Sequence, residues 1–261
     1  MPLADSDGTS IYYERHGSGP TILFVHGSGG HHAAWWQQVA ALREEFTVVT
    51  VDLRGFGKSD SSMAEFDGQD FPGDVVAVLD AEDLTDAMLV GQSIGSVAAL
   101  RAGLLRPERV GSVVLGHSLG GISHPELREL AAADRAEAVK LPVIDRLLTE
   151  RFQRERPDLT FLFQQMGTFN VAKMADLRNL DTDGPSLADI EASGVKVAFL
   201  AGEKDAVLGV KTVTRAHELT AGSHLEIVPD APHSMYWETP QRYNAAVARL
   251  RRTLTAQKEA A

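Results

Sequence analysis

Three residues in separate loops have the types that nucleophilic attack on an acyl group requires. Ser93 could supply the nucleophile, His233 the general base, and Asp205 the acid that orients the imidazole. Each follows a short run that is typical of a buried strand, and parallel strands bring their carboxyl ends to one edge of a sheet. No single loop is decisive, but the three together predict a catalytic triad.

The segment Gly-Gln-Ser-Ile-Gly at residues 91–95 is the most informative of the three loops. It follows a strand-like run and opens a helical run, which is the context of a sharp turn that exposes a nucleophile. Glycines are expected because side chains there would collide with the neighbouring strand and helix. A second copy at residues 116–120 leads into loop residues, so we assign Ser93 rather than Ser118 as the nucleophile. Ser118 is interpreted as a polar residue near the pocket, and the role of His117 is left open.

Residues 26–30, His-Gly-Ser-Gly-Gly, follow another strand-like run and would let backbone N–H groups approach a ligand closely. We expect the N–H groups of Ser28 and Ile94 to form an oxyanion hole, with Gly27 and Gly29 lining the substrate site. By itself the segment is equally consistent with a glycine-rich turn.

Two other carboxylates compete for the role of the triad acid. Glu203 lies two residues before Asp205, and Asp230 lies three residues before His233 on the same loop. We favour Asp205. A metal-dependent lactonase is disfavoured because the histidines at 26, 31 and 32 lack the required ligand spacing. We expect no metal and no other cofactor.

Strand-like and helical runs alternate along most of the chain, which indicates an α/β fold. The rhythm breaks between residues 118 and 186, a mainly helical stretch that we interpret as a cap inserted into a core of residues 1–117 and 187–261. The run at 10–15 alternates and is expected to be an antiparallel edge strand. Thr239 and Pro240 are expected to be the N-cap and first residue of the last helix. The other expected strands lie at 21–25, 46–51, 87–90, 112–115, 195–200 and 224–228, and the helices at 33–44, 73–83, 94–106 and 240–255.

Composition narrows the classes of partner. The 261 residues contain 25 Lys and Arg against 36 Asp and Glu, a net charge of −11 that would repel nucleic acid and anionic lipid. There is no cysteine, no signal-like N-terminal segment, and no apolar run near the ~20 residues that cross a bilayer. We expect a cytoplasmic protein with a small-molecule substrate and neither a nucleic-acid nor a membrane partner. The oligomeric state is open, a homodimer included.

Taken together, these motifs resemble those of the α/β-hydrolase superfamily over almost the whole chain. The resemblance implies eight mostly parallel strands, with a helical cap after the sixth. It implies a structural role for Asp52 and Arg54. Because Ser93 stands where haloalkane dehalogenases and epoxide hydrolases of this fold have aspartate, those activities are disfavoured. The matching segments are His26-Gly27, Asp52-Leu53-Arg54-Gly55-Phe56-Gly57-Lys58-Ser59, residues 91–95, Gly202-Glu203-Lys204-Asp205 and Pro232-His233.

The predicted function is hydrolysis of a small carboxylic ester or lactone through an acyl-enzyme. Cleavage of an activated C–C bond, or another cofactor-free reaction, on the same triad is an alternative. For C–C cleavage, cap arginines at 151, 154 and 156 could hold a substrate carboxylate. A ligand receptor that retains the triad is another. We expect Phe161, Phe163 and Phe169 of the cap to line the acyl pocket, and Trp36 to pack in the core.

Overall fold

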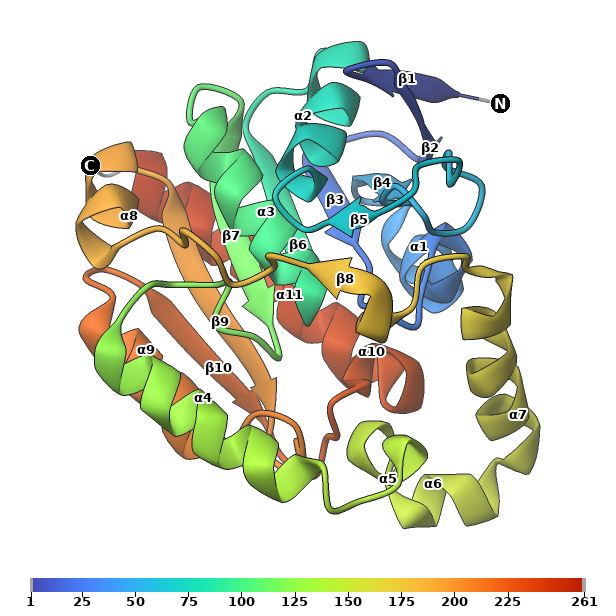
Figure 1. The fold of residues 1–261 in the computed structure, drawn as a ribbon. Helices are drawn as coiled ribbons and strands as arrows, with labels where there is room; N and C mark the ends of the chain where they lie inside the picture. Colours follow the sequence, from blue (N-terminus) through green and yellow to red (C-terminus); the bar gives the residue numbers. More distant parts are fainter. Residues whose placement is uncertain (1, 260–261) are drawn as a thin grey trace.

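The computed structural model describes the backbone of residues 2–259 and the side chains of residues 2–255. A central sheet of eight strands has the order β1-β2-β4-β3-β6-β7-β9-β10, in which only the pairs β1–β2 and β2–β4 are antiparallel (Figure 1). This confirms the expected eight-stranded, mostly parallel sheet. Its strands are β1 (Leu3–Ser6), β2 (Thr9–His16), β3 (Thr21–Val25), β4 (Thr47–Val51), β6 (Ala87–Gln92), β7 (Val110–Gly116), β9 (Lys196–Gly202) and β10 (His224–Val228).

The antiparallel strand predicted at residues 10–15 is present as β2, but it is not the edge of the sheet. β1 pairs with it on the outer side, through a hairpin whose turn residues Asp7 and Gly8 both have positive φ. An Asp-Gly pair favours such a turn because both of its central residues adopt left-handed backbone conformations. The edge assignment was therefore wrong, because β1 forms the edge of the sheet and β2 lies between β1 and β4.

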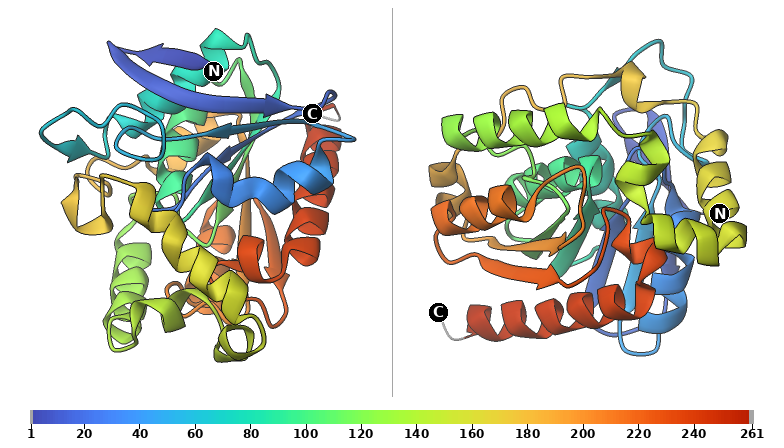
Figure 2. Two further views of the ribbon diagram at one scale, coloured as in Figure 1. Left: turned by 90° about the vertical axis from the view of Figure 1, so that its right-hand side faces the viewer. Right: turned by 90° about the horizontal axis from the view of Figure 1, so that it is seen from below.

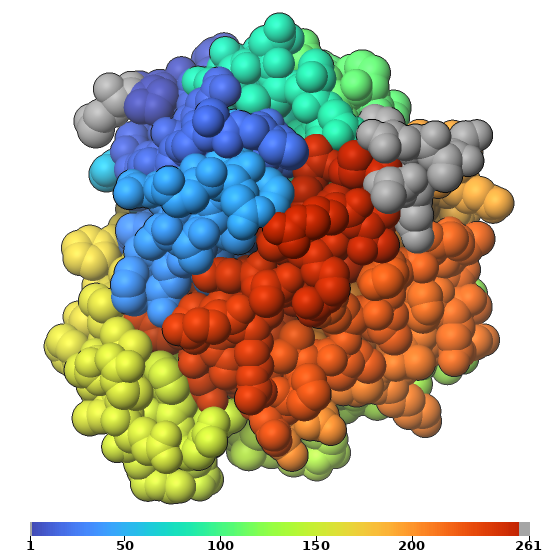
Figure 3. Space-filling model, turned by 180° about the vertical axis from the view of Figure 1, so that it is seen from behind, coloured from blue at the N-terminus to red at the C-terminus, as the bar shows by residue number. Residues whose placement is uncertain are grey.

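Helices cover both faces of the sheet (Figure 1), and Figure 3 shows one of these faces covered by blue and red segments from the two halves of the chain. Each face of the sheet has its own apolar core. One face carries α2 (Phe71–Ala81), α3 (Ile94–Leu105), α8 (Leu187–Ser193) and α9 (Val210–Leu219). The other carries α1 (Trp36–Leu42), α10 (Met235–Glu238) and α11 (Pro240–Glu259). The inner parallel strands β4, β6 and β7 are buried on both faces, which explains why their sequences are mostly apolar rather than alternating. The edge strand β10 is half-buried and contains His224 and Glu226.

Two details at the ends of helices differ from expectation. The run predicted as one helix from residue 33 begins as a 3₁₀ helix, η1 (His32–Trp35), before α1. As a result Trp35 is fully buried, whereas Trp36, expected in the core, is 48% exposed. Pro240 does open α11, but the Thr239 hydroxyl donates to the Met235 carbonyl of α10 instead of capping α11.

The segment between β7 and α8 is mainly helical, as predicted. It contains α4 (Pro125–Ala138), α5 (Val143–Leu147), α6 (Glu150–Glu155), α7 (Pro157–Met166), η2 (Gly167–Phe169) and η3 (Met174–Asp176). A short strand, β8 (Leu177–Arg178), pairs with β5 (Phe66–Asp67) in a second sheet that was not expected. α4 lies along α9, where Asp134 accepts hydrogen bonds from Gly209 and Thr212 (Figure 2). That this segment acts as a cap stays a prediction.

Helices α5 to α7 lie beyond the carboxyl ends of the strands and are attached to α10 (Figure 1). Ser234 N–H donates to the Leu147 carbonyl at 2.9 Å, and the Trp237 indole donates to the Leu159 carbonyl at 3.1 Å. Residues 234–237, which follow His233, therefore hold α5 and α7 in place. No helix in the described part of the chain combines the length and hydrophobicity that a bilayer span requires.

Candidate active site

Strand register brings the predicted loops together. Val25 of β3 pairs with Gly91 of β6, and Gln92 pairs with Gly116 of β7. Gly202 of β9 is in register with Val228 of β10. Because these strands are parallel and end at nearly the same level, the loops that follow them meet at one edge.

Ser93 lies in a strained turn between β6 and α3. Its backbone has φ 52° and ψ −117°, a conformation that non-glycine residues rarely adopt, and its N–H donates to the Gly116 carbonyl at 2.8 Å. A Cβ on Gly91 would lie 2.3 Å from Ser96 Cα, and one on Gly95 would lie 2.3 Å from the Val25 carbonyl oxygen. The collisions expected from the sequence are therefore present.

Gly95→Ala should destabilise the fold by about 3 kcal/mol or more, since the added methyl group meets backbone atoms that cannot move aside. Urea unfolding monitored by circular dichroism measures this loss. Gly29→Ala is the matched control, because a Cβ there has no neighbour within 4 Å and its change should be near zero. Equal stability of the two variants would contradict the packing argument.

The aspartate and histidine of the predicted triad are in contact. His233 Nδ1 lies 3.0 Å from each carboxylate oxygen of Asp205, and the Asp205 side chain is fully buried. Burial by itself would raise the pKa of Asp205, but attraction to His233 and hydrogen bonds from two histidines outweigh it and hold the pKa well below its ordinary value. Asp205 is thus an ionised acceptor for the imidazole.

Neither competing acid has this contact. Glu203 accepts a hydrogen bond from the Asp230 N–H at 3.1 Å, and the exposed Asp230 side chain faces Lys204 at 4.0 Å. The Gln92 amide also donates to the His233 carbonyl at 2.9 Å, which ties the Ser93 turn to the histidine loop. Within the described residues the Ser93 hydroxyl makes no hydrogen bond, so its contact with His233 stays a prediction.

A histidine that the sequence analysis left without a role also contacts Asp205. His117, the residue after β7, lies with Nδ1 2.9 Å from Asp205 Oδ2, and its side chain is fully buried. The signal that could have located it is its place at the carboxyl end of the strand between those of Ser93 and Asp205. Its neighbour Ser118 accepts a hydrogen bond from Gly120 N–H in a turn, and α4 begins only at Pro125.

The predicted oxyanion loop lies beside the Ser93 turn. A Cβ on Gly27 would be 3.3 Å from the Gln92 carbonyl oxygen and 3.5 Å from Ser93 Cβ. Ser28 is half-buried and Gly29 is exposed. Ile94 is the first residue of α3, and the N–H groups of the first turn of a helix have no partner within the helix. The arrangement is compatible with two donors beside Ser93, although their convergence on one point stays a prediction.

Asn170 joins this loop to two other segments. Its side-chain amide donates to the Gly30 carbonyl at 3.0 Å, and its side-chain oxygen accepts from Gly57 N–H at 3.0 Å. Lys173 in turn donates to the Gly167 carbonyl. Asn170 is buried, so this connection between the segment after α7 and the 26–30 loop is held away from water.

A family model described as alpha/beta hydrolase fold matches residues 20–240. The chain belongs to the α/β-hydrolase fold family.

Among relatives of this α/β hydrolase, the 2-hydroxy-6-oxononadienedioate/2-hydroxy-6-oxononatrienedioate hydrolase of Escherichia coli is 27% identical over 259 residues, covering 91% of this chain and 89% of the relative. An esterase from Thermogutta terrifontis superimposes with a TM-score of 0.81 at 23% identity, covering 97% of this chain and 98% of the esterase. Est816, described as an N-acyl homoserine lactone degrading enzyme, has a TM-score of 0.76 at 25% identity, covering 95% of this chain and 99% of its own.

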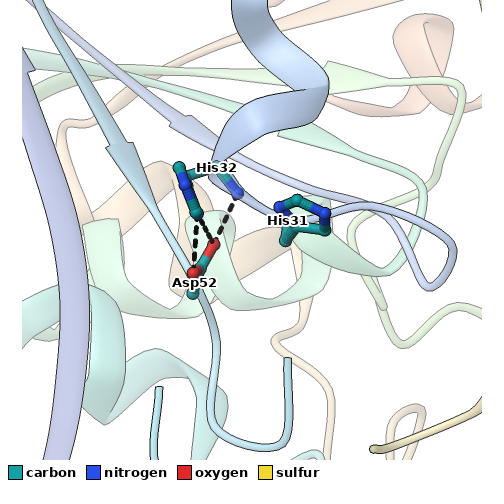
Figure 4. A group of neighbouring side chains, drawn as sticks. All are labelled: His31, His32 and Asp52. Carbon is teal, nitrogen blue, oxygen red and sulfur yellow. Dashed lines mark hydrogen bonds and ion pairs between the residues drawn. The ribbon is translucent and has the colours of Figure 1, made fainter. Parts of the chain in front are cut away.

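The motif after β4 is structural in this α/β hydrolase, as the resemblance implied. Asp52 is fully buried and accepts hydrogen bonds from His32 and from Lys58 N–H, while Arg54 forms an ion pair with buried Asp74. Figure 4 shows the His32 ring facing Asp52, with the His31 ring beside them and no interaction drawn between His31 and Asp52. Burial lowers the pKa of His31 to about 4, so this imidazole is neutral near pH 7.

His31, His32 and Asp52 lie close enough to one another to be considered as metal ligands, and so do His117, Asp205 and His233. In both groups the carboxylate already accepts hydrogen bonds from histidine and from backbone N–H groups. These bonds hold His32 against Asp52, and His117 and His233 against Asp205.

The three phenylalanines predicted to line the pocket of this α/β hydrolase have different environments. Phe161 is 63% exposed and Phe169 is 69% exposed, whereas Phe163 packs on Trp237 with ring centroids 5.5 Å apart. The ring centroids of Phe169 and His31 are 6.1 Å apart, which places Phe169 near the 26–30 loop. The three rings therefore do not form one closed cluster.

Proposed function

We propose that this α/β hydrolase is a serine hydrolase that cleaves a small carboxylic ester or lactone through an acyl-enzyme. The observation that carries the proposal is the buried Asp205–His233 pair at the same sheet edge as the strained Ser93 turn. A strained serine between a strand and a helix is suited to attack because its hydroxyl is raised above the sheet.

In the proposed reaction His233 Nε2 accepts the proton of Ser93 as its oxygen attacks the substrate carbonyl. The ionised Asp205 holds the ring so that Nδ1 carries the other proton, and it stabilises the imidazolium that forms. The N–H groups of Ser28 and Ile94 stabilise the negative oxygen of the tetrahedral intermediate. The alcohol leaves with the proton from His233, and water then attacks the acyl-enzyme by the same steps to release the acid.

The similarity to the lactone-degrading Est816 supports the choice of esters and lactones. The Escherichia coli hydrolase supports the alternative, cleavage of an activated C–C bond. That alternative requires an arginine that faces the substrate carboxylate. Arg151 is exposed, Arg154 lies near Glu150 on an exposed helix face, and Arg156 is paired with Asp158. We therefore propose ester or lactone hydrolysis first.

A substrate panel separates these functions. Purified protein should turn over p-nitrophenyl acetate or butyrate, or a homoserine or aromatic lactone, many times per active site. A receptor that retains the triad should stop after at most one slow turnover. Preference for a vinylogous β-diketone acid over every ester and lactone would favour the C–C alternative.

The proposed cap segment should influence chain-length preference without being needed for reactivity. Phe163→Ala removes a ring that packs on Trp237 of α10, the helix that follows His233. It should change the ratio of kcat/KM for butyrate and acetate esters by about 1–3 kcal/mol, or roughly 5- to 150-fold. Phe161→Ala serves as the exposed control, and Phe169→Ala tests the ring beside His31. All three variants should still react with an organophosphonate at Ser93.

If all three variants fold and keep the same chain-length profile, these rings do not line the acyl pocket. The proposal for the triad would stand in that case, because phosphonate labelling reports on Ser93 and not on the pocket wall.

A further inference from the structure

His117 is held rigidly beside the acid of the proposed triad. It follows β7 with φ 54°, and its N–H donates to the Leu200 carbonyl of β9 at 2.8 Å. This places its ring in the space between the ends of β7 and β9, where Nδ1 reaches Asp205 Oδ2 at 2.9 Å. The ring centroids of His117 and His233 are 5.3 Å apart.

The charge state of Asp205 determines the tautomer of His117. Burial lowers the pKa of His117, more than its bond to Asp205 raises it, so the ring is neutral. An ionised carboxylate accepts hydrogen bonds only, and therefore the proton of the neutral ring lies on Nδ1. Nε2 is then a buried acceptor, and among the described residues it has no hydrogen-bond partner. Of the two ring nitrogens of His117, only Nδ1, which faces Asp205, makes a hydrogen bond.

Asp205 Oδ2 consequently receives two imidazole donors, one from His117 and one from His233. The other oxygen, Oδ1, accepts the N–H groups of Val207 and Leu208 and the second branch of the His233 bond. The ionisable groups that act on this carboxylate are the two histidines, from the loops after β7 and β10. Gln92, which also contacts the histidine loop, is uncharged.

We infer that His117 is a positioning residue that orients Asp205 and lowers the pH at which His233 becomes protonated. A hydrogen bond to Oδ2 draws negative charge away from the His233 contact, which weakens the stabilisation of the imidazolium. His233 then stays available as a base at lower pH. This inference rests on the proposed function, in which His233 is the general base.

The test compares three variants at His117. His117→Ala removes the donor, and His117→Leu removes it while filling the space against water. His117→Asn keeps an N–H donor near the Nδ1 position and tolerates a positive φ. We expect the acidic limb of the kcat/KM–pH profile to move upward by roughly half a pH unit or more in the Ala and Leu variants. It should return toward the wild-type position in the Asn variant.

An unchanged acidic limb in a folded Ala or Leu variant would overturn the inference, and so would an Asn variant that shifts as far as Ala. Circular dichroism melting establishes which variants are folded. If one of the two donor-free variants does not fold, the other decides.

A second readout separates this inference from the proposed function. The ring C2–H signal of His233 in the NMR spectrum reports the midpoint of its titration without any substrate. If the protein hydrolyses nothing but the midpoint rises in the Ala variant, the proposed function fails and the electrostatic role of His117 stands. If hydrolysis is normal and neither the midpoint nor the pH profile moves, only the inference fails.

Discussion

Replacing Ser93 with alanine should abolish ester hydrolysis, with a loss on the order of 10⁴-fold or more in kcat. The variant lacks the oxygen that forms the acyl-enzyme, while the backbone of the turn is held by the Gly116 carbonyl and by closely packed glycines. Steady-state kinetics with p-nitrophenyl acetate measures the loss, and circular dichroism verifies that the fold is retained.

Ser118→Ala is the matched control for this experiment because it removes the same group from the second copy of the motif. The Ser118 hydroxyl accepts a hydrogen bond from Gly120 in a turn, so most activity should survive its removal. Mass spectrometry should find an organophosphonate on the peptide that contains Ser93. A label on Ser118, or activity lost only in the Ser118 variant, would reverse our assignment.

Asp205→Asn should lower kcat by about 10⁴-fold, although its side chain has nearly the same shape. The Asn oxygen can accept the N–H groups of Val207 and Leu208, as Oδ1 of Asp205 does. Its NH₂ group would then face the Nδ1 atoms of His117 and His233, which must become acceptors. His233 would carry its proton on Nε2 and could not remove the proton of Ser93.

Steady-state kinetics at pH 7 to 8 measures this effect, with Glu203→Gln as the control. Glu203 contacts the Asp230 N–H and not His233, so its removal should leave kcat within a few-fold of wild type. A large loss in the Glu203 variant together with an active Asp205 variant would show that the wrong carboxylate was chosen.

Several features of the fold follow from local sequence and were predicted from it. The inner parallel strands are mostly apolar because helices cover both faces of the sheet, and short apolar runs located the six parallel strands. The alternating run at residues 10–15 located a seventh strand, β2. The turn around Ser93 requires glycines two residues on either side because backbone atoms lie within 3 Å of any added Cβ. These steric and packing requirements involve residues that are close in the sequence, so they can be recognised from short sequence patterns.

Contacts across the sheet were decided by tertiary structure. His117 and Asp205 are 88 positions apart and meet only because β7 and β9 are neighbours in register. Asn170 reaches Gly30 across 140 positions for a similar reason, since the segment after α7 folds back over the 26–30 loop. The sequence places His117 at the end of a strand, but it does not give the order of the strands that makes Asp205 its neighbour.

The sequence by itself determined the α/β architecture, the candidate nucleophile and the loops that carry its candidate partners. The tertiary structure decided which of three nearby carboxylates contacts His233, and it added His117 as a second donor to that carboxylate. It also decided that Trp35, not Trp36, is buried, because a 3₁₀ turn precedes α1. Residue type and short-range pattern restrict what a side chain can do, whereas strand order, register and packing determine which group it meets.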